Sequence, residues 1–264
     1  MLVLYARCLI SDAEETLFHL LAACRLRLLR RRGCVPEPSH SRPGIWASIA
    51  AVFRLNRLPC LMLNVLVASL VASYYLSPSM AGTWRMVGEF KVHWSFLFSF
   101  VSTVFSAVLL PSTVQWAMGT LPPAHRLRRI LCLGLFWGVR GMEIDLFYRA
   151  QGWVFGQGHD AGTLAVKVAV DQFVYSVLWA VPTYVIVLRW IDMDWSWTRT
   201  RASLNRHFWT HTYPSVLFTN WIVWIPTVAL VYSLPGDLQF PLFSVVMCFF
   251  ILIVTLLARG QAKG

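Results

Sequence analysis

Residues 215–258 read SVLFTNWIVWIPTVALVYSLPGDLQFPLFSVVMCFFILIVTLLA, and Asp237 is the only charged residue among them. An α-helix rises 1.5 Å per residue, so about 20 apolar residues cross the roughly 30 Å hydrocarbon core of a bilayer. Pro235 and Gly236 interrupt the stretch, and both residue types break helices. The stretch therefore predicts two transmembrane helices, at 215–234 and 240–258, joined by a tight turn.

The rest of the chain has the same apolar character. Of its 264 residues, 57% are hydrophobic and 13% are charged, whereas soluble domains have about 25% charged residues. This composition excludes a soluble globular domain, and the low polarity excludes a long disordered chain. Four more apolar segments are long enough to cross a bilayer, at 58–77, 94–110, 130–148 and 164–188. We predict an all-α, polytopic transmembrane helix bundle with six apolar spans.

The basic residues are unevenly placed, and they predict the orientation of these spans. The chain carries a net charge of +11. When the Lys and Arg residues outside the six spans are assigned to alternate sides of the membrane, one side holds 18 and the other holds 3. Basic residues concentrate in cytoplasmic loops. We therefore expect both termini on the cytoplasmic-type side of a bacterial inner membrane or an organelle membrane, and we expect no nucleic-acid binding.

Three regions differ in composition. Residues 1–57 form a basic N-terminal arm that includes a Pro-rich linker, VPEPSHSRPG at 35–44. Within the arm, CRLRLLRRR at 24–32 could bind an anionic membrane surface, and a leader with no fold is the alternative. Residues 58–258 form the transmembrane helical domain, and residues 259–264 form a short tail.

Five charged side chains fall inside the third and fourth predicted spans. A charge at the centre of a bilayer costs about 2.5–3.5 kcal/mol on insertion scales, so these groups should face protein or water and be paired. Three pairs have a helical spacing of three or four residues, namely Arg140–Glu143, Asp145–Arg149 and Lys167–Asp171. The pairs could lock helices together, or they could line a hydrated path for ions or polar solutes. With two amides, the charges form a predicted polar seam or pore: Arg140, Glu143, Asp145, Lys167, Asp171, Gln172 and Asn220.

Small residues recur on two of the predicted helices. Gly134 and Gly138 have the GxxxG spacing that lets two helix backbones approach closely, and Gly141 follows on the same span. In the second span, steps of four, three and four residues place four hydroxyls on one helix face: Ser95, Ser99, Ser102 and Ser106. Both patterns favour helix packing, although the serine stripe could also line a narrow aqueous lumen.

The motifs that could indicate an enzyme or a metal site are incomplete. His207 and His211 are four residues apart but lack the glutamate of a zinc-protease helix. Asp192 and Asp194 could hold a divalent ion, but two acids at the end of a span are equally typical of an interfacial loop. We expect no resident metal, no cofactor and no enzymatic activity. A membrane enzyme for lipid-linked substrates is the competing interpretation, and it would use Asp192, Asp194, Glu143 or Asp145.

Two sequence blocks point to a family. The fourth span begins with KVAVDQ at 167–172, and the fifth begins with YPSVLFTNWIVWIP at 213–226. In this order, the blocks resemble signatures of the Mpv-type family of small peroxisomal and mitochondrial inner-membrane proteins, also called the peroxisomal membrane protein family. The resemblance is best over residues 164–258, and Trp221 stands where that family usually has tyrosine. It implies a divergent, bacterial-type member whose signature residues would be Lys167, Asp171, Gln172, Tyr213, Pro214, Asn220, Trp224 and Pro226.

This resemblance implies a non-enzymatic integral membrane protein with a role in channel-like passage of small solutes and in membrane homeostasis. A polar seam between the second, third and fourth spans would form the passage. The alternative is a membrane-structural or assembly protein in which the intramembrane charges only hold helices together. The expected partner is the lipid bilayer, and assembly into a homo-oligomer is left open.

Overall fold

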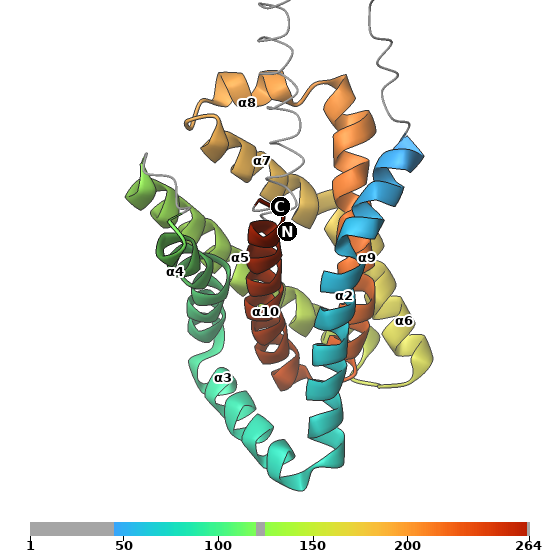
Figure 1. Cartoon of the computed structure of the whole chain (residues 1–264). Coiled ribbons are helices and arrows are strands. Elements are labelled where there is room, and N and C mark those ends of the chain that lie inside the picture. The colour runs from blue at the N-terminus through green and yellow to red at the C-terminus, as the bar shows by residue number, and fades with distance from the viewer. Residues whose placement is uncertain (1–44, 120–124, 263–264) are drawn as a thin grey trace, which may run out of the picture.

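The computed structural model describes residues 45–119 and 125–262, which form a bundle of helices without any strand (Figure 1). Most of the predicted N-terminal arm, including 24–32, lies outside the described residues, as does the end of the predicted tail. The elements are α2 (Ile45–Leu76), α3 (Pro78–Val104), η2 (Phe105–Leu109), α4 (Leu110–Ala117), α5 (Arg126–Phe155), α6 (Ala161–Ala169), η3 (Val170–Ala180), α7 (Val181–Asp192), α8 (Trp197–Ser203), η4 (Phe208–Thr212), α9 (Tyr213–Tyr232) and α10 (Gly236–Ala262).

Five helical runs in the described part of the chain are long and apolar enough to cross a membrane: Arg57–Leu76, Pro78–Ala117, Ala161–Asp192, Phe208–Tyr232 and Gly236–Ile253. They coincide with five of the six predicted spans and are compatible with an integral membrane protein. The remaining prediction, 130–148, falls within α5, which is 30 residues long. Three charged residues in the middle of α5 (Arg140, Glu143 and Asp145) make it more polar than the other five runs. The count of six spans is therefore not confirmed.

The second run starts earlier than the sequence predicted. Its first helix, α3, begins at Pro78 because Ser77 caps it, the Ser77 hydroxyl accepting a hydrogen bond of 3.4 Å from the Met80 N–H. The run then bends at Ser95, whose φ of 44° and ψ of −122° are not helical. In Figure 1 the first half of α3 and the end of α2 form a hairpin that reaches below the other helices. The first half of α3 was not predicted as part of a span because it contains charged residues such as Lys91.

The elements η2, η3 and η4 are π-helical, and each ends two residues before a proline. These prolines are Pro111, Pro182 and Pro214. A proline ring lacks an N–H and clashes with the carbonyl of the residue four positions earlier, and a wider turn relieves that clash. The longest π-helical element is η3, with 11 residues, and it contains Asp171 and Gln172.

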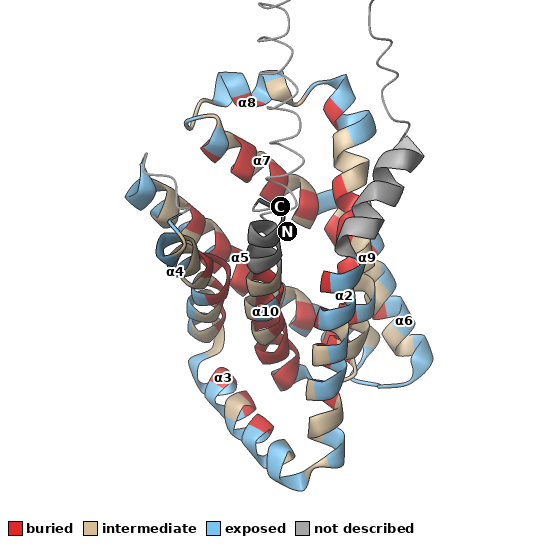
Figure 2. Cartoon of the chain, in the orientation of Figure 1, coloured by how far each residue is buried: buried red, intermediate tan, exposed pale blue. Residues whose placement is uncertain are grey.

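The chain folds back and forth between two ends of the bundle. In Figure 1 the start of α2, the start of α5 and all of α8 lie at the upper end, whereas the turns α2–α3, α5–α6 and α9–α10 lie towards the lower end. Buried residues concentrate in the centre of the bundle, and exposed residues lie on its periphery (Figure 2). Many peripheral residues are large and apolar, for example Leu76, Met86, Leu131 and Leu178, as expected of helices that contact lipid.

Candidate functional site

The charged groups of the predicted seam are mostly buried. Arg140, Asp145, Lys167 and Asp171 are each at most 5% exposed, and Glu143 is 31% exposed but ion-paired. The groups avoid the lipid-facing surface, as the high free energy of a charge in hydrocarbon requires. However, they do not form one continuous seam. The structure separates them into a centre around Asp145, a cluster around Arg140 and a centre around Asp171.

The Asp145 centre joins α5 to α3. The Lys91 ammonium lies 2.8 Å from Asp145 Oδ1, and the Arg149 guanidinium lies 3.0 Å from Oδ2. The Ser99 hydroxyl donates a 2.8 Å hydrogen bond to the same carboxylate, and Arg149 also donates to the Ser95 hydroxyl at the bend of α3. The predicted pair Asp145–Arg149 is confirmed. Two cations from two helices thus neutralise one buried carboxylate.

The small residues bring these helices into contact. A Cβ atom on Gly138 would overlap the Phe100 ring, and one on Gly141 would overlap Thr103 and the Ser99 carbonyl oxygen, whereas Gly134 has no neighbour closer than 3.9 Å. The close approach of α3 therefore depends on Gly138 and Gly141 and not on the first glycine of the GxxxG pattern.

The remaining serines of the stripe contact helix neighbours as well. Ser102 lies 3.2 Å from the Ser244 hydroxyl of α10, and the buried Ser106 donates to the Thr103 carbonyl of its own helix. The stripe thus contacts α5 and α10, in keeping with a packing surface.

The Arg140 cluster links α5 to η3 and α7. The Arg140 guanidinium lies 2.8 Å from Glu143 Oε1, which confirms the predicted pair. The Tyr175 hydroxyl donates a 2.6 Å hydrogen bond to the same Glu143 oxygen, and Arg140 also donates to the Thr183 hydroxyl. The positive charge of Arg140 is therefore neutralised within the cluster.

The Asp171 centre has a different composition, because its partners are uncharged. Asp171 accepts a 2.7 Å hydrogen bond from the Tyr232 hydroxyl of α9 and a 2.8 Å hydrogen bond from the Gln172 amide. Behind them, the Gln151 amide of α5 donates to Tyr232 Oη at 3.2 Å, and the Asn220 amide of α9 donates to Gln172 Oε1 at 3.3 Å. The centre therefore draws one carboxylate and three amides from three helices.

The predicted ion pair Lys167–Asp171 is wrong. Among the described residues, no ion pair joins Lys167 to Asp171. The wider turns of η3 begin at Val170, between the two residues, so a four-residue step no longer returns to the same helix face. Lys167 is instead packed at 2% exposure, and its carbonyl oxygen accepts a 3.0 Å hydrogen bond from Gln151.

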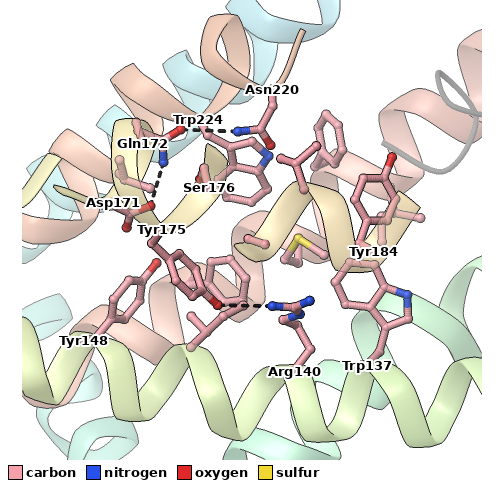
Figure 3. A pocket seen from close by; sticks show the side chains of 18 residues that line it. Trp137, Arg140, Tyr148, Asp171, Gln172, Tyr175, Ser176, Tyr184, Asn220 and Trp224 are labelled. Atoms are coloured by element: carbon pink, nitrogen blue, oxygen red, sulfur yellow. Dashed lines mark hydrogen bonds between the residues drawn. The ribbon is translucent and has the colours of Figure 1, made fainter. Parts of the chain in front are cut away.

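A cavity of about 90 Å³ lies beside Asp171 and extends to Arg140 (Figure 3). Asp171, Gln172 and Asn220 line one part of it, and Figure 3 shows Tyr175 between Asp171 and Arg140. Since a water takes up about 30 Å³ in the liquid, the cavity has room for about three waters or one small ligand. Three segments that are far apart in the sequence thus place polar groups around one cavity.

The π-helical geometry of η3 explains why so much of one helix faces this cavity. The lining residues on η3 and α7 recur as pairs at steps of four or five residues: Asp171 and Gln172, Tyr175 and Ser176, Ala180 and Val181, then Tyr184. A π-helix has hydrogen bonds from residue i to i+5, so steps of four and five stay on one face. Such π-helical turns occur frequently at functional sites.

Side chains from the fourth run, Phe208–Tyr232, hold η3 in this form. The Trp221 ring N–H donates a 2.7 Å hydrogen bond to the Gln172 carbonyl, and the Tyr213 hydroxyl donates a 2.5 Å hydrogen bond to the Val177 carbonyl. Pro214 follows η4, Trp224 lines the cavity, and Pro226 lies inside α9. Most residues that carried the family resemblance therefore surround η3 or the cavity.

Of the acids in the enzyme interpretation, Glu143 belongs to the Arg140 cluster and Asp145 to its own centre, whereas Asp192 and Asp194 form other ion pairs. Asp192, the last residue of α7, is paired with Arg129 at 2.8 Å, and Asp194, in the α7–α8 connection, is paired with Arg199 at 3.3 Å. The rings of His207 and His211 stack with centroids 4.8 Å apart. Within 45–119 and 125–262, no three His, Cys, Asp or Glu residues form a group suited to a metal ion.

Sequence reasoning missed several residues of the site. Lys91 lies four residues before Ser95 and eight before Ser99, on the face of the serine stripe. Tyr232 likewise continues the four-residue steps of Asn220 and Trp224. Extending the serine stripe by one step would have found Lys91, and extending the other stripe by two steps, past Val228, would have found Tyr232. Comparison of the chain with protein-family models, characterised proteins and solved structures gave no match.

Proposed function

We propose that this protein is an integral membrane protein through which small solutes pass in a channel-like manner, by way of the cavity beside Asp171. The observation that carries the proposal is that buried polar groups from α5, η3 and α9 converge on one cavity inside a bundle of apolar helices. Building such a cavity is costly in a membrane, because each polar group must be removed from water. The resemblance to the Mpv-type family supports the same function, since Asp171, Gln172, Asn220 and Trp224 all line the cavity.

The same proposal places α5 as a sixth, polar crossing and both termini on the cytoplasmic-type side. Its support is that the start of α5, with Arg126, Arg128 and Arg129, and the α7–α9 connection, with Arg199, Arg201 and Arg206, lie at the end of the bundle where α2 begins. The positive-inside rule orients that end towards the cytoplasm or its equivalent. The proposal contains no catalytic step, and the lipid bilayer is the partner of the exposed apolar faces.

The proposal is tested with the full-length protein in liposomes loaded with small neutral and charged solutes. We expect solute efflux above that of empty liposomes, and Asp171→Asn should change its rate or selectivity because the charge in the cavity is lost. Asp194→Asn is the matched control, since it removes the same charge from an exposed loop residue. Efflux no faster than from empty liposomes, across a range of voltages and pH values, would refute the proposal.

The Asp145 centre favours a second candidate function. Its charges are paired between α3 and α5, and Lys91, Asp145 and Arg149 do not line the cavity beside Asp171. This is the arrangement of a membrane-structural or assembly protein, alone or as a homo-oligomer. If this is the whole function, Asp171→Asn should alter thermal stability in detergent and leave the permeability of the liposomes unchanged.

A further inference from the structure

Asp171 lacks a cationic partner within the described residues. It is 5% exposed, and none of the ion pairs there includes it. Arg140 lines the same cavity but is neutralised by Glu143. The charges of Arg140 and Glu143 cancel, so the negative charge of Asp171 is left in excess at the cavity. A buried carboxylate without a counter-charge is unfavourable, so a cation that enters the cavity would be bound.

The hydrogen bonds around Asp171 are oriented to stabilise its charged form. Tyr232 Oη accepts a hydrogen bond from Gln151, so its single hydrogen is free to be donated to Asp171. Gln172 accepts from Asn220 through its amide oxygen, so its NH₂ group is directed at Asp171. Both chains donate toward the carboxylate, and hydrogen bonds to the charged form favour that form.

Aromatic rings form a large part of the cavity walls. The Trp224 and Phe243 ring centroids are 5.6 Å apart, and the Tyr148 and Phe243 centroids are 6.1 Å apart, so these three rings form a continuous wall. Trp137, Tyr184 and Phe250 add further rings. Aromatic faces attract cations with little hydration, and a carboxylate with aromatic rings is the chemistry that recognises alkylated ammonium groups.

We infer that the cavity binds a small organic ammonium cation, with Asp171 as its counter-charge and the rings of Tyr148, Trp224 and Phe243 as its walls. This inference rests on the proposed function in one respect, since it names the class of solute that the cavity admits. Na⁺ and K⁺ bind less well, because the aromatic walls do not replace their hydration shells.

The test uses the purified full-length protein in detergent and two probes of the same shape. Choline carries a trimethylammonium group, and 3,3-dimethyl-1-butanol has an uncharged carbon in its place. In isothermal titration calorimetry, we expect choline to bind at least about tenfold more tightly than the neutral compound, the equivalent of about 1.4 kcal/mol. Equal affinities, or equal competition by K⁺ at the same concentration, would overturn the inference without the need for any variant.

Two variants then locate the binding site. Asp171→Asn should weaken choline binding at least about tenfold, whereas Asp194→Asn, the exposed control, should leave it unchanged. Trp224→Phe keeps an aromatic face and should retain more affinity than Trp224→Leu. Melting curves show whether each variant is folded, and unchanged choline affinity in folded Asp171→Asn would place the site elsewhere.

The two proposals fail in different ways. Choline binding without efflux from liposomes would leave the cation site standing and refute the passage. Efflux of neutral solutes without choline binding would leave the passage standing and refute the cation site.

Discussion

Asp145 and Asp171 are both buried, at 1% and 5% exposure, yet their charges are balanced in different ways. Asp145 has two cations within 3.0 Å, contributed by α3 and by α5 itself. Within 45–119 and 125–262, Asp171 has only hydroxyl and amide donors, and a cavity of about 90 Å³ adjoins it. A buried charge whose counter-charges come from the protein fixes helices in place. A buried charge that lacks them is available to a cation from outside.

The backbone is closely packed around Asp145 and widened around Asp171. Near Asp145, Gly138 and Gly141 allow α3 and α5 to come into direct contact. Near Asp171, the wide turns of η3 direct pairs of side chains to one face, and space remains beside them. The comparison therefore assigns stability to the first centre and ligand binding to the second.

Replacement of Asp145 should give the largest effect. Asp145→Asn leaves the buried Lys91 ammonium facing a neutral group, and breaking a buried ion pair costs about 3–5 kcal/mol of unfolding free energy. Asp171→Asn leaves no cation unpaired, so its loss of unfolding free energy should be less than half that of Asp145→Asn. Chemical denaturation in mixed micelles measures both, and adding Lys91→Met to Asp145→Asn should restore most of the loss. Equal losses at the two aspartates would remove the distinction between the centres.

The glycines provide the next largest effect. In Gly141→Ala, the new methyl group collides with Thr103 and with the Ser99 backbone, so the helices must separate, at about 1–3 kcal/mol. Gly134→Ala is the matched control, because its nearest neighbour is 3.9 Å away and alanine favours a helix by about 1 kcal/mol. Melting temperatures of the two variants should therefore shift in opposite directions. A similar loss in both would mean that the contact of α3 with α5 does not depend on Gly141.

Much of this fold could be predicted from hydropathy alone. The predicted spans 215–234 and 240–258 carry no charged residue, and helices α9 and α10 cover most of them. The first half of α3 could not be predicted in this way, because Arg85, Glu89 and Lys91 interrupt its apolar residues. Lys91 becomes acceptable only when α5 places Asp145 against it, and hydropathy contains no information on such pairing between helices.

The site could be predicted only in part. Local pairs such as Arg140–Glu143 follow from ordinary helical spacing, and they are present. The pair Lys167–Asp171 fails because η3 is π-helical there, and the sequence gives little warning: Pro182 follows η3, but Pro226 lies inside α9 with no π-helical turn. Tyr232 reaches Asp171 from a helix 61 residues later, a contact that depends on the tertiary fold.

Replacement of Trp221 should have a smaller effect, and it tests whether the Asp171 centre depends on the π-helical form of η3. Trp221→Phe removes the N–H that bonds to the Gln172 carbonyl, which should cost about 1 kcal/mol of unfolding free energy. Choline affinity should fall as well, because Gln172 helps to hold Asp171 in its charged form. Trp209→Phe is the control, since that ring is exposed. If choline affinity were unchanged, η3 would keep its form without this hydrogen bond.

The smallest effect is expected at Asp160, a surface aspartate that serves as a reference for the two buried ones. It caps α6, and hydrogen bonds from the Thr163 side chain and backbone N–H lower the pKa of its carboxyl group. A lowered pKa in the folded state means that this cap adds stability above the carboxyl pKa of the unfolded chain, about 3.9. The contribution is lost as the pH falls through the folded pKa. Asp160→Ala should therefore lower the melting temperature slightly at neutral pH and have no effect in strong acid, where the wild-type carboxyl group is protonated as well. A difference from wild type that persisted in strong acid would mean that the Asp160 side chain stabilises α6 through packing and not through its charge.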